Sequence, residues 1–379
     1  MKHRDKSAIV VGAGIGGLTS AIALKNAGWN VTVYERASDL KPLGAALSLW
    51  SNAVEGLRQL DVLSAILPNA ERISTMLVAD KQGRPIIGPH SMDELSIMIA
   101  RADLQRTLLN ELGTENVVLG KKVFRLKNGK GNACVSFETG FTAEADLVVD
   151  AAGIRSIGSI PTDLSYRGYS GILAISNAVS NSSLNGSASE FWGEHERFGV
   201  FELPANRHYW FYMRSARPGA RMPSKAGVLA QAKEWPRTIG DAVKATRETD
   251  FVPFEIFAAA PPRTLGEGRI IQVGDAAHPM EPNLGQGACQ AIEDAAALSV
   301  LATDLDPVEI GPAFNRLRLK RVRTIVNRAA EGKYGAHANS LIRGSMRAAL
   351  RSIPTNLSLA LSRRIQTMPD YAAMLRATR

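Results

Sequence analysis

The chain has 379 residues, of which 45% are hydrophobic and 21% charged, and its formal net charge is +9. This apolar fraction excludes a mainly disordered chain, and the length suggests two or three domains. The 33 glycines and 18 prolines are scattered and only two cysteines occur, which excludes a collagen-like chain, a disulfide scaffold and a cysteine-ligated zinc cluster.

The N-terminal elements form a compact β–turn–α–β pattern. Ser7–Val11 is expected to be a short buried strand, followed by a glycine-rich turn at Gly12–Gly17. Leu18–Ala27 is expected to be a helix ended by Gly28, and Asn30–Tyr34 a second strand. Units of this kind build parallel sheets covered by helices.

The glycine turn fits the GxGxxG pattern of dinucleotide-binding proteins. In that pattern Gly12 permits the tight turn, Gly14 lets the backbone approach a pyrophosphate, and Gly17 lets the helix pack closely on the strand. The N–H groups at the start of the helix favour phosphate. Glu35, at the end of the second strand, is placed to accept a hydrogen bond from a ribose 2′-OH. This favours FAD or NAD over NADP and leaves the choice between those two open.

The first residues resemble a secretory signal, because a basic start precedes an apolar stretch. We interpret them instead as the start of the first strand, because the apolar stretch holds glycines at a meaningful spacing and no convincing cleavage site. The sequence contains no run of 18 apolar residues, so it predicts no membrane-spanning helix. We expect a cytoplasmic protein in which Cys134 and Cys289 are reduced thiols.

The middle of the chain changes in character. Helices are expected at Asn52–Leu60, Ala102–Leu112, most of 219–250 and Gly285–Leu301, and strands at Gly120–Val135, Thr142–Asp150, Phe251–Ala258 and Arg269–Val273. Between them, Tyr166–Met213 shows short alternating segments with many aromatic residues, which is typical of an antiparallel sheet. An antiparallel sheet between two α/β segments predicts one domain inserted into another.

The C-terminal segment carries the positive charge. Residues 311–379 hold 14 Lys and Arg but only 2 Asp and Glu, so the rest of the chain is close to neutral. The segment is expected to be helical and broken at Pro354. We interpret the charge as a solvated helix face, with an anionic membrane surface as the alternative, and we expect no nucleic-acid partner.

Four stretches resemble the class A flavoprotein monooxygenases, the family with the para-hydroxybenzoate hydroxylase fold. They are Gly12–Arg36, Ala100–Leu109, Leu147–Ser156 and Gly268–Leu298, and they span most of residues 7–300. The resemblance implies bound FAD, transient reduction by NADH or NADPH, and oxygen transfer to an aromatic or conjugated small molecule through a flavin C4a-hydroperoxide. No metal is expected.

With this resemblance the fold prediction becomes specific. We predict an α/β protein with a discontinuous Rossmann-like FAD-binding domain at residues 1–165 and 259–310. An antiparallel-sheet substrate domain would be inserted at residues 166–258, and a basic helical segment would follow at residues 311–379.

The resemblance also implies a set of cofactor contacts. Arg101 would bind the phosphate and ribose region, although a surface cation is the alternative, and Asp275 would bind the ribitol chain, although a helix N-cap is the alternative. Val123 would hold the adenine through backbone atoms, although a core position is the alternative. Besides Gly12, Gly14, Gly17 and Glu35, the remaining expected contacts are Ile15, Gly16, Arg36, Leu47, Ser48, Gly285, Gln286, Gly287 and Ala288.

Two positions depart from the family pattern. Ala152 stands where the third fingerprint commonly has an Asp that contacts FAD and the pyridine nucleotide, and Asp150 is not expected to replace it. This departure motivates an alternative, an FAD oxidoreductase that inserts no oxygen. A separate alternative is a flavin- or ligand-binding protein without turnover. Cys289 stands where Asn is frequent, and we expect an inert buried thiol there.

The substrate is expected on the antiparallel sheet. Alternation places Tyr209 and Phe211 on one face and His208, Trp210 and Tyr212 on the other, and we choose the Tyr209 face as the pocket. Arg197 and Pro279 are further candidate substrate contacts, and a surface position is the alternative for Arg197. Candidate acid–base groups are Tyr209, Tyr212 and His278, and a loop residue fixed by hydrogen bonds is the favoured alternative for His278.

Overall fold

The computed structural model describes residues 6–40, 45–156, 163–179 and 184–377. Its first layer is a mainly parallel sheet around β1 (Ser7–Val11), which pairs with β2 (Asn30–Tyr34) on one side and β12 (Leu147–Asp150) on the other. The full order is β18-β19-β12-β1-β2-β8, with β18 (Gly266–Glu267), β19 (Ile270–Gln272) and β8 (Val117–Val118). The strands after residue 259 thus complete the sheet that begins at residue 7.

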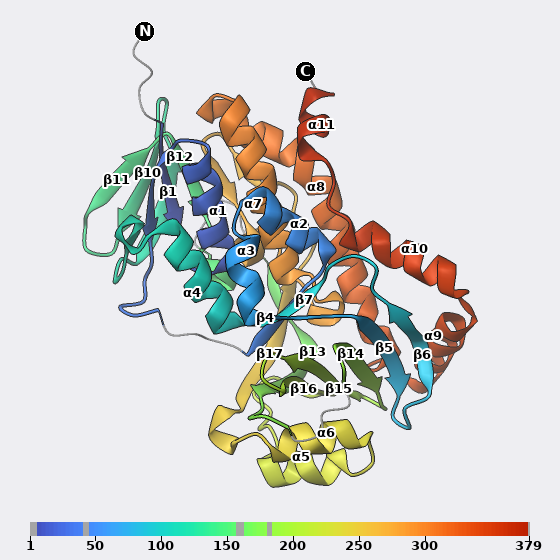
Figure 1. Cartoon of the computed structure of the whole chain (residues 1–379). Helices are drawn as coiled ribbons and strands as arrows, with labels where there is room; N and C mark the ends of the chain where they lie inside the picture. The colour runs from blue at the N-terminus through green and yellow to red at the C-terminus, as the bar shows by residue number, and fades with distance from the viewer. Residues whose placement is uncertain (1–5, 41–44, 157–162, 180–183, 378–379) are drawn as a thin grey trace.

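Both faces of this sheet are covered. On one face lie α1 (Ile15–Asn26), α4 (Arg101–Leu112) and α7 (Gly287–Asp304), whose leucines share one core with the strands (Figure 1). On the other face lies a small sheet of β9 (Val123–Asn128), β10 (Ala133–Phe137) and β11 (Thr142–Ala145). A sheet buried on both faces needs continuous apolar strands, as the SAIVV of β1 provides.

A second sheet has seven strands in the order β17-β13-β16-β15-β14-β5-β6. It is antiparallel except where β14 pairs with β5. The strands are β13 (Leu164–Ile175), β14 (Ser187–Trp192), β15 (Glu196–Leu203), β16 (Arg207–Ser215), β17 (Val252–Ala259), β5 (Thr75–Asp80) and β6 (Pro85–Ser91). The sheet therefore takes in two strands that precede residue 166.

One face of the seven-stranded sheet is closed by α5 (Lys225–Ala232) and α6 (Arg237–Lys244), which lie beneath it in Figure 1. Trp210, Tyr212 and Phe198 pack against these helices in a separate core. The opposite face, with Tyr209 and Phe211, is turned toward the first sheet. A third, three-stranded sheet of β3 (Ala46–Leu49), β7 (Ile97–Ala100) and β4 (Ala70–Arg72) adjoins α2 (Ser51–Gln59) and α3 (Leu63–Ile66).

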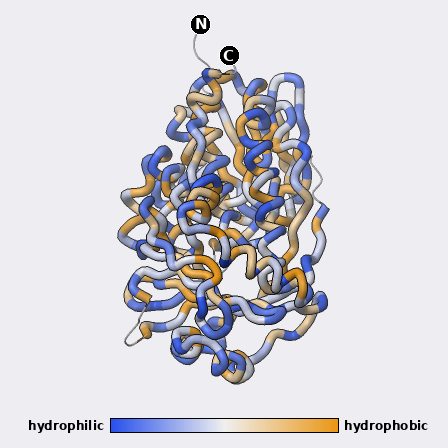
Figure 2. The backbone as a smooth tube through the Cα atoms, turned by 90° about the vertical axis from the view of Figure 1, so that its right-hand side faces the viewer, coloured by the Kyte–Doolittle hydropathy of each residue, from blue (hydrophilic) through white to orange (hydrophobic). Residues whose placement is uncertain are grey.

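The C-terminal part is helical, as expected. It consists of α8 (Pro307–Glu331), α9 (Ser340–Ser352), α10 (Thr355–Gln366) and α11 (Tyr371–Arg376), with the predicted break at Pro354. Asp306 and Glu309 form a capping box that starts α8. No helix in the described part of the chain is long and apolar enough to cross a membrane, and hydrophobic and hydrophilic residues alternate along the backbone (Figure 2).

Candidate active site

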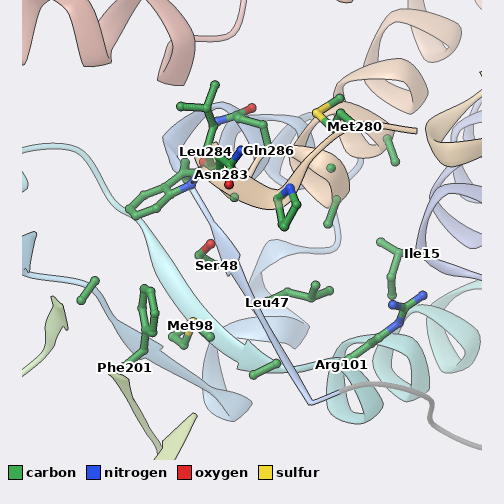
Figure 3. Close-up of a pocket in the computed structure, with 18 of the residues that line it drawn as sticks. Ile15, Leu47, Ser48, Met98, Arg101, Phe201, Met280, Asn283, Leu284 and Gln286 are labelled. Carbon is green, nitrogen blue, oxygen red and sulfur yellow. Dashed lines mark hydrogen bonds between the residues drawn. The ribbon is translucent and has the colours of Figure 1, made fainter. Parts of the chain in front are cut away.

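A cavity of about 460 Å³ lies between the first sheet and the seven-stranded sheet, a size typical of ligand pockets. In Figure 3, Arg101 and Ile15 stand at one end and Phe201 at the other, with Leu47 and Ser48 between them. Of the FAD contacts expected from sequence, those that line the cavity are Gly14, Ile15, Gly16, Leu47, Ser48, Arg101, Asp275, Gly285, Gln286, Gly287 and Ala288.

The glycine turn has the geometry that a pyrophosphate needs. Gly12 has φ +102°, and a Cβ there would lie 2.5 Å from the Ala151 carbonyl oxygen, while a Cβ on Gly17 would overlap the Gly12 carbonyl oxygen. A Cβ on Gly14 would meet no atom within 4 Å. Gly14 begins α1 without a side-chain cap, so the first N–H groups of the helix are available to a ligand. These residues fit a phosphate-containing cofactor.

Glu35 supports the turn from behind. Its Oε2 accepts a hydrogen bond from the Ala13 N–H at 2.8 Å and its Oε1 from the Ala37 N–H at 2.9 Å. Glu35 and Arg36 do not line the cavity. Val123 is buried in the core between the first sheet and the β9–β11 sheet, so its side chain is also outside the cavity wall.

A second loop closes the cavity from the other side. Gly285 has φ +61°, and a Cβ there would lie 2.7 Å from Ser48 Oγ, so glycine lets this loop approach β3 closely. The helix α7 begins two residues later, after Gln286, and its first N–H groups carry no side-chain cap. The positive end of this helix therefore faces the cavity, where it favours negative charge on a ligand.

The third fingerprint has no carboxylate in the cavity. Asp150 is fully buried and accepts hydrogen bonds from the Ala152 N–H at 3.1 Å, from Ser156 and from Gln272 Nε2 at 3.3 Å. Asp150 does not line the cavity, whereas Gly153, with φ +76°, does. Asp150 therefore does not take over the position of the missing Asp.

A buried ionic cluster stands behind the second loop. Asp294 Oδ2 accepts a hydrogen bond from the Gly274 N–H at 2.9 Å and contacts His278 Nε2 at 2.7 Å, while Arg318 Nε donates to Asp294 Oδ1 at 2.8 Å. Arg318 also binds Glu293, and the side chains of His278, Asp294, Arg318 and Glu293 are all fully buried. His278 does not line the cavity. Its place is in the scaffold of the loop that carries Asp275.

Burial alone would raise the pKa of Glu293 and Asp294, but the charge of Arg318 and the surrounding hydrogen bonds lower both below their ordinary values. Both carboxylates are therefore ionised at neutral pH. Sequence reasoning missed it, and the only sequence signal is an acidic pair, Glu293–Asp294, inside an alanine-rich buried helix.

The substrate side matches the predicted alternation. Tyr209, Phe211 and Arg197 line the cavity, whereas Tyr212 faces the other side of the sheet and donates a hydrogen bond to Glu196 Oε2 at 2.9 Å. Burial raises the pKa of Tyr209 above its ordinary value of 10, so this phenol is protonated at neutral pH. Pro279 does not line the cavity; its carbonyl accepts the Ala259 N–H at 3.0 Å. The cavity residues that sequence reasoning missed include Glu190 and Asn283.

Cys289 is a buried thiol beneath β3. Burial raises the pKa of Cys289 from 9.0 to about 12, which reduces its thiolate about 1,000-fold at neutral pH. We expect a thiol reagent at pH 7–8 to modify the half-buried Cys134 while leaving Cys289 unmodified until the chain unfolds. Mass spectrometry of the alkylated native and unfolded proteins measures this. Rapid modification of Cys289 in the native protein would contradict an inert thiol.

The match to known proteins decides the family. The family model described as an FAD binding domain matches residues 5–313. The chain belongs to this family of flavoproteins. An aurachin C monooxygenase/isomerase of Stigmatella aurantiaca is 32% identical over 77% of this flavoprotein and 79% of the relative. A 3-amino-4-hydroxybenzoate 2-monooxygenase of Streptomyces cremeus is 31% identical over 87% of each chain.

Solved structures agree with this assignment. The flavoprotein superposes with a TM-score of 0.85 on Klebsiella pneumoniae HpxO complexed with FAD and uric acid, with 26% identity over 95% of this chain and 96% of that one. Among the sequence relatives, an FAD-dependent urate hydroxylase of Mycolicibacterium vanbaalenii is 30% identical over 87% of this chain and 88% of the relative. The predicted fold and the predicted class, an FAD-dependent monooxygenase, are thereby confirmed.

Proposed function

We propose that FAD lies along the cavity with its pyrophosphate at Gly14 and Arg101 and its ribitol chain at Asp275. The support is the open space at Gly14 and the uncapped start of α1. Glu35, with Arg36 and Val123, would hold the adenosine end. Bound FAD supplies the redox chemistry, accepting electrons from NADH or NADPH and activating dioxygen.

The flavin ring would lie between Leu47–Ser48 and the start of α7 at Gly285–Ala288. The helix N-terminus there favours negative charge on the pyrimidine edge of the ring. Pocket residues from both sheets would line the space around the ring and keep water away from it.

The substrate is proposed to be a small aromatic or conjugated molecule between the flavin and the seven-stranded sheet. The observation that carries this is the continuity of one cavity from Gly14 to an apolar end formed by Met98, Phe201, Tyr209 and Phe211. Flat apolar ligands suit such aromatic walls. The relatives named for urate and aminohydroxybenzoate chemistry agree with this size and shape of substrate.

We also propose that the chain divides into an FAD-binding domain at residues 1–165 and 259–310, a substrate domain at residues 166–258 and a C-terminal segment at residues 311–379. In this division β5 and β6 belong to the FAD-binding domain by sequence but pair within the sheet of the substrate domain.

A cytoplasmic location is also proposed, and the two unpaired cysteines support it.

The reaction is tested with isotope-labelled dioxygen. The FAD-loaded protein is supplied with NADH or NADPH and a panel of aromatic compounds, and products are analysed by mass spectrometry. We expect substrate-stimulated consumption of one nicotinamide and one labelled oxygen atom in the product. Tyr212→Phe serves as a control, because its hydroxyl faces away from the cavity. Stimulated turnover with no label in any product would identify an oxidoreductase that inserts no oxygen.

A further inference from the structure

The apolar end of the cavity contains one ion pair. Glu190 of β14 and Arg197 of β15 lie on the face of the seven-stranded sheet that faces the flavin side, with Glu190 Oε1 3.0 Å from Arg197 Nη1. Their cavity neighbours are mainly apolar or aromatic: Met76, Leu77, Ala188, Phe201, Tyr209, Phe211 and Met213. A ligand at this end therefore meets few polar groups, and those few determine which ligands bind.

Both terminal nitrogens of the Arg197 guanidinium already have partners in the protein, because Nη1 is paired with Glu190 and Nη2 with Asn283. Its Nη2 donates to Asn283 Oδ1 at 2.5 Å and lies 3.1 Å from Met213 Sδ, and its side chain is only 2% exposed. Its Nε has no partner in the described part of the chain but is fully enclosed, so a ligand cannot reach it without displacing neighbours. An anionic substrate would have to compete with Glu190 for this cation.

The carboxylate of Glu190 is satisfied on one side only. Oε1 accepts hydrogen bonds from Arg197 and from Trp192 Nε1 at 2.7 Å, and Oε2 takes none from the described residues. The side chain is 19% exposed and lines the cavity, so Oε2 is available from the cavity. A ligand that displaces water there without donating a hydrogen bond leaves a charged acceptor unpaired, which is costly.

We propose that Glu190 Oε2 accepts a hydrogen bond from an N–H or O–H of an uncharged aromatic substrate and thereby selects donor-bearing rings over methylated and anionic ones. This inference rests on the proposed function, because it places the substrate at this end of the same cavity. Tyr209, whose phenol stays protonated, lies on the same wall and can donate to a substrate oxygen. No covalent step is assigned to either residue.

The test uses the full-length, FAD-loaded protein and matched bicyclic probes. They are 2-naphthol, its methyl ether 2-methoxynaphthalene, and naphthalene-2-carboxylate, with indole and 1-methylindole as a second pair. Binding is measured from the change in the absorption spectrum of bound FAD. We expect each donor probe to bind about 10-fold or more tightly than its methylated partner, and 2-naphthol more tightly than the carboxylate.

Two variants assign the preference to this side chain. Glu190→Met removes the acceptor at similar volume and should bring the donor-to-methyl ratio close to one, whereas Glu190→Gln keeps an oxygen acceptor and should keep part of the preference. Glu255→Met, an exposed glutamate on β17 of the same sheet, should behave as wild type. FAD content is measured for each variant to show that the fold and the cofactor site are intact.

The preference is overturned if the wild type binds none of the probes, binds methylated and donor probes equally, or prefers the carboxylate. It is also overturned if Glu190→Met retains the wild-type ratio while retaining FAD. A wild-type protein that takes up no FAD, or whose products never contain labelled oxygen, refutes the proposed function itself. FAD uptake and product labelling are measured separately from the probe titrations, so the failure of the preference and the failure of the proposed function are distinguishable.

Discussion

Replacing Gly14 by alanine should give a folded protein that binds FAD about 10- to 100-fold more weakly. A hydrogen bond to a charged group contributes about 1.5–3 kcal/mol, and a methyl group at Gly14 would hold the pyrophosphate away from the N–H groups of α1. In the cofactor-free chain the same methyl group meets no atom within 4 Å, and the φ of −76° suits alanine. The loss should therefore appear in cofactor affinity and not in folding.

The measurement is a titration of cofactor-free protein with FAD, followed by quenching of flavin fluorescence, together with the thermal unfolding midpoint without FAD. Gly344→Ala, in the exposed helix α9 with equally open space, is the matched control and should leave FAD affinity unchanged. Wild-type FAD affinity in Gly14→Ala would show that the cofactor phosphates do not approach this turn.

The predictions that rested on local sequence patterns agree best with the structure. The turn at Gly12–Gly17 needs glycines because the helix packs directly against the strand. The spacing of these glycines in the amino-acid sequence is enough to indicate that requirement. Strand alternation separated the cavity face with Tyr209 and Phe211 from the opposite face with Tyr212. In both cases neighbours in sequence determine the geometry.

Contacts between residues far apart in the chain could not be predicted from the sequence. Nothing around residues 75–91 indicates that β5 will pair with β14, more than a hundred residues later. Glu190 and Asn283 meet at the cavity only because two distant segments converge on Arg197. Each of these residues alone resembles an ordinary surface polar residue, and its role depends on partners that the local pattern does not specify.

Replacing Arg318 by methionine should lower the free energy of unfolding by about 3–5 kcal/mol. Removing one member of a buried ion pair leaves the other charge without compensation, and Asp294 would keep only His278 and the Gly274 N–H. Glu293 would still be paired with Arg321, so Asp294 carries most of the cost. The measurement is urea unfolding of the FAD-free chain, which avoids stabilisation by bound cofactor.

Arg328→Met is the matched control on the same helix. Arg328 is 60% exposed and pairs with Glu331 three residues away, so its loss should cost at most about 1 kcal/mol. A similar loss of unfolding free energy in both variants would show that the buried cluster around Arg318 stabilises the fold no more than an exposed ion pair does.

The pH dependence separates an unpaired charge from lost packing. In the wild type, Arg318 holds the pKa of Asp294 and Glu293 below 3.8 and 4.5, so their contribution is present at neutral pH and is lost as the pH falls through the lowered values. In Arg318→Met, burial should instead raise the pKa of Asp294, so protonation relieves the cost in mild acid. The difference in unfolding free energy should therefore shrink from pH 7 toward pH 4. A constant difference over that range would mean that Arg318 stabilises the fold by packing and not by its charge.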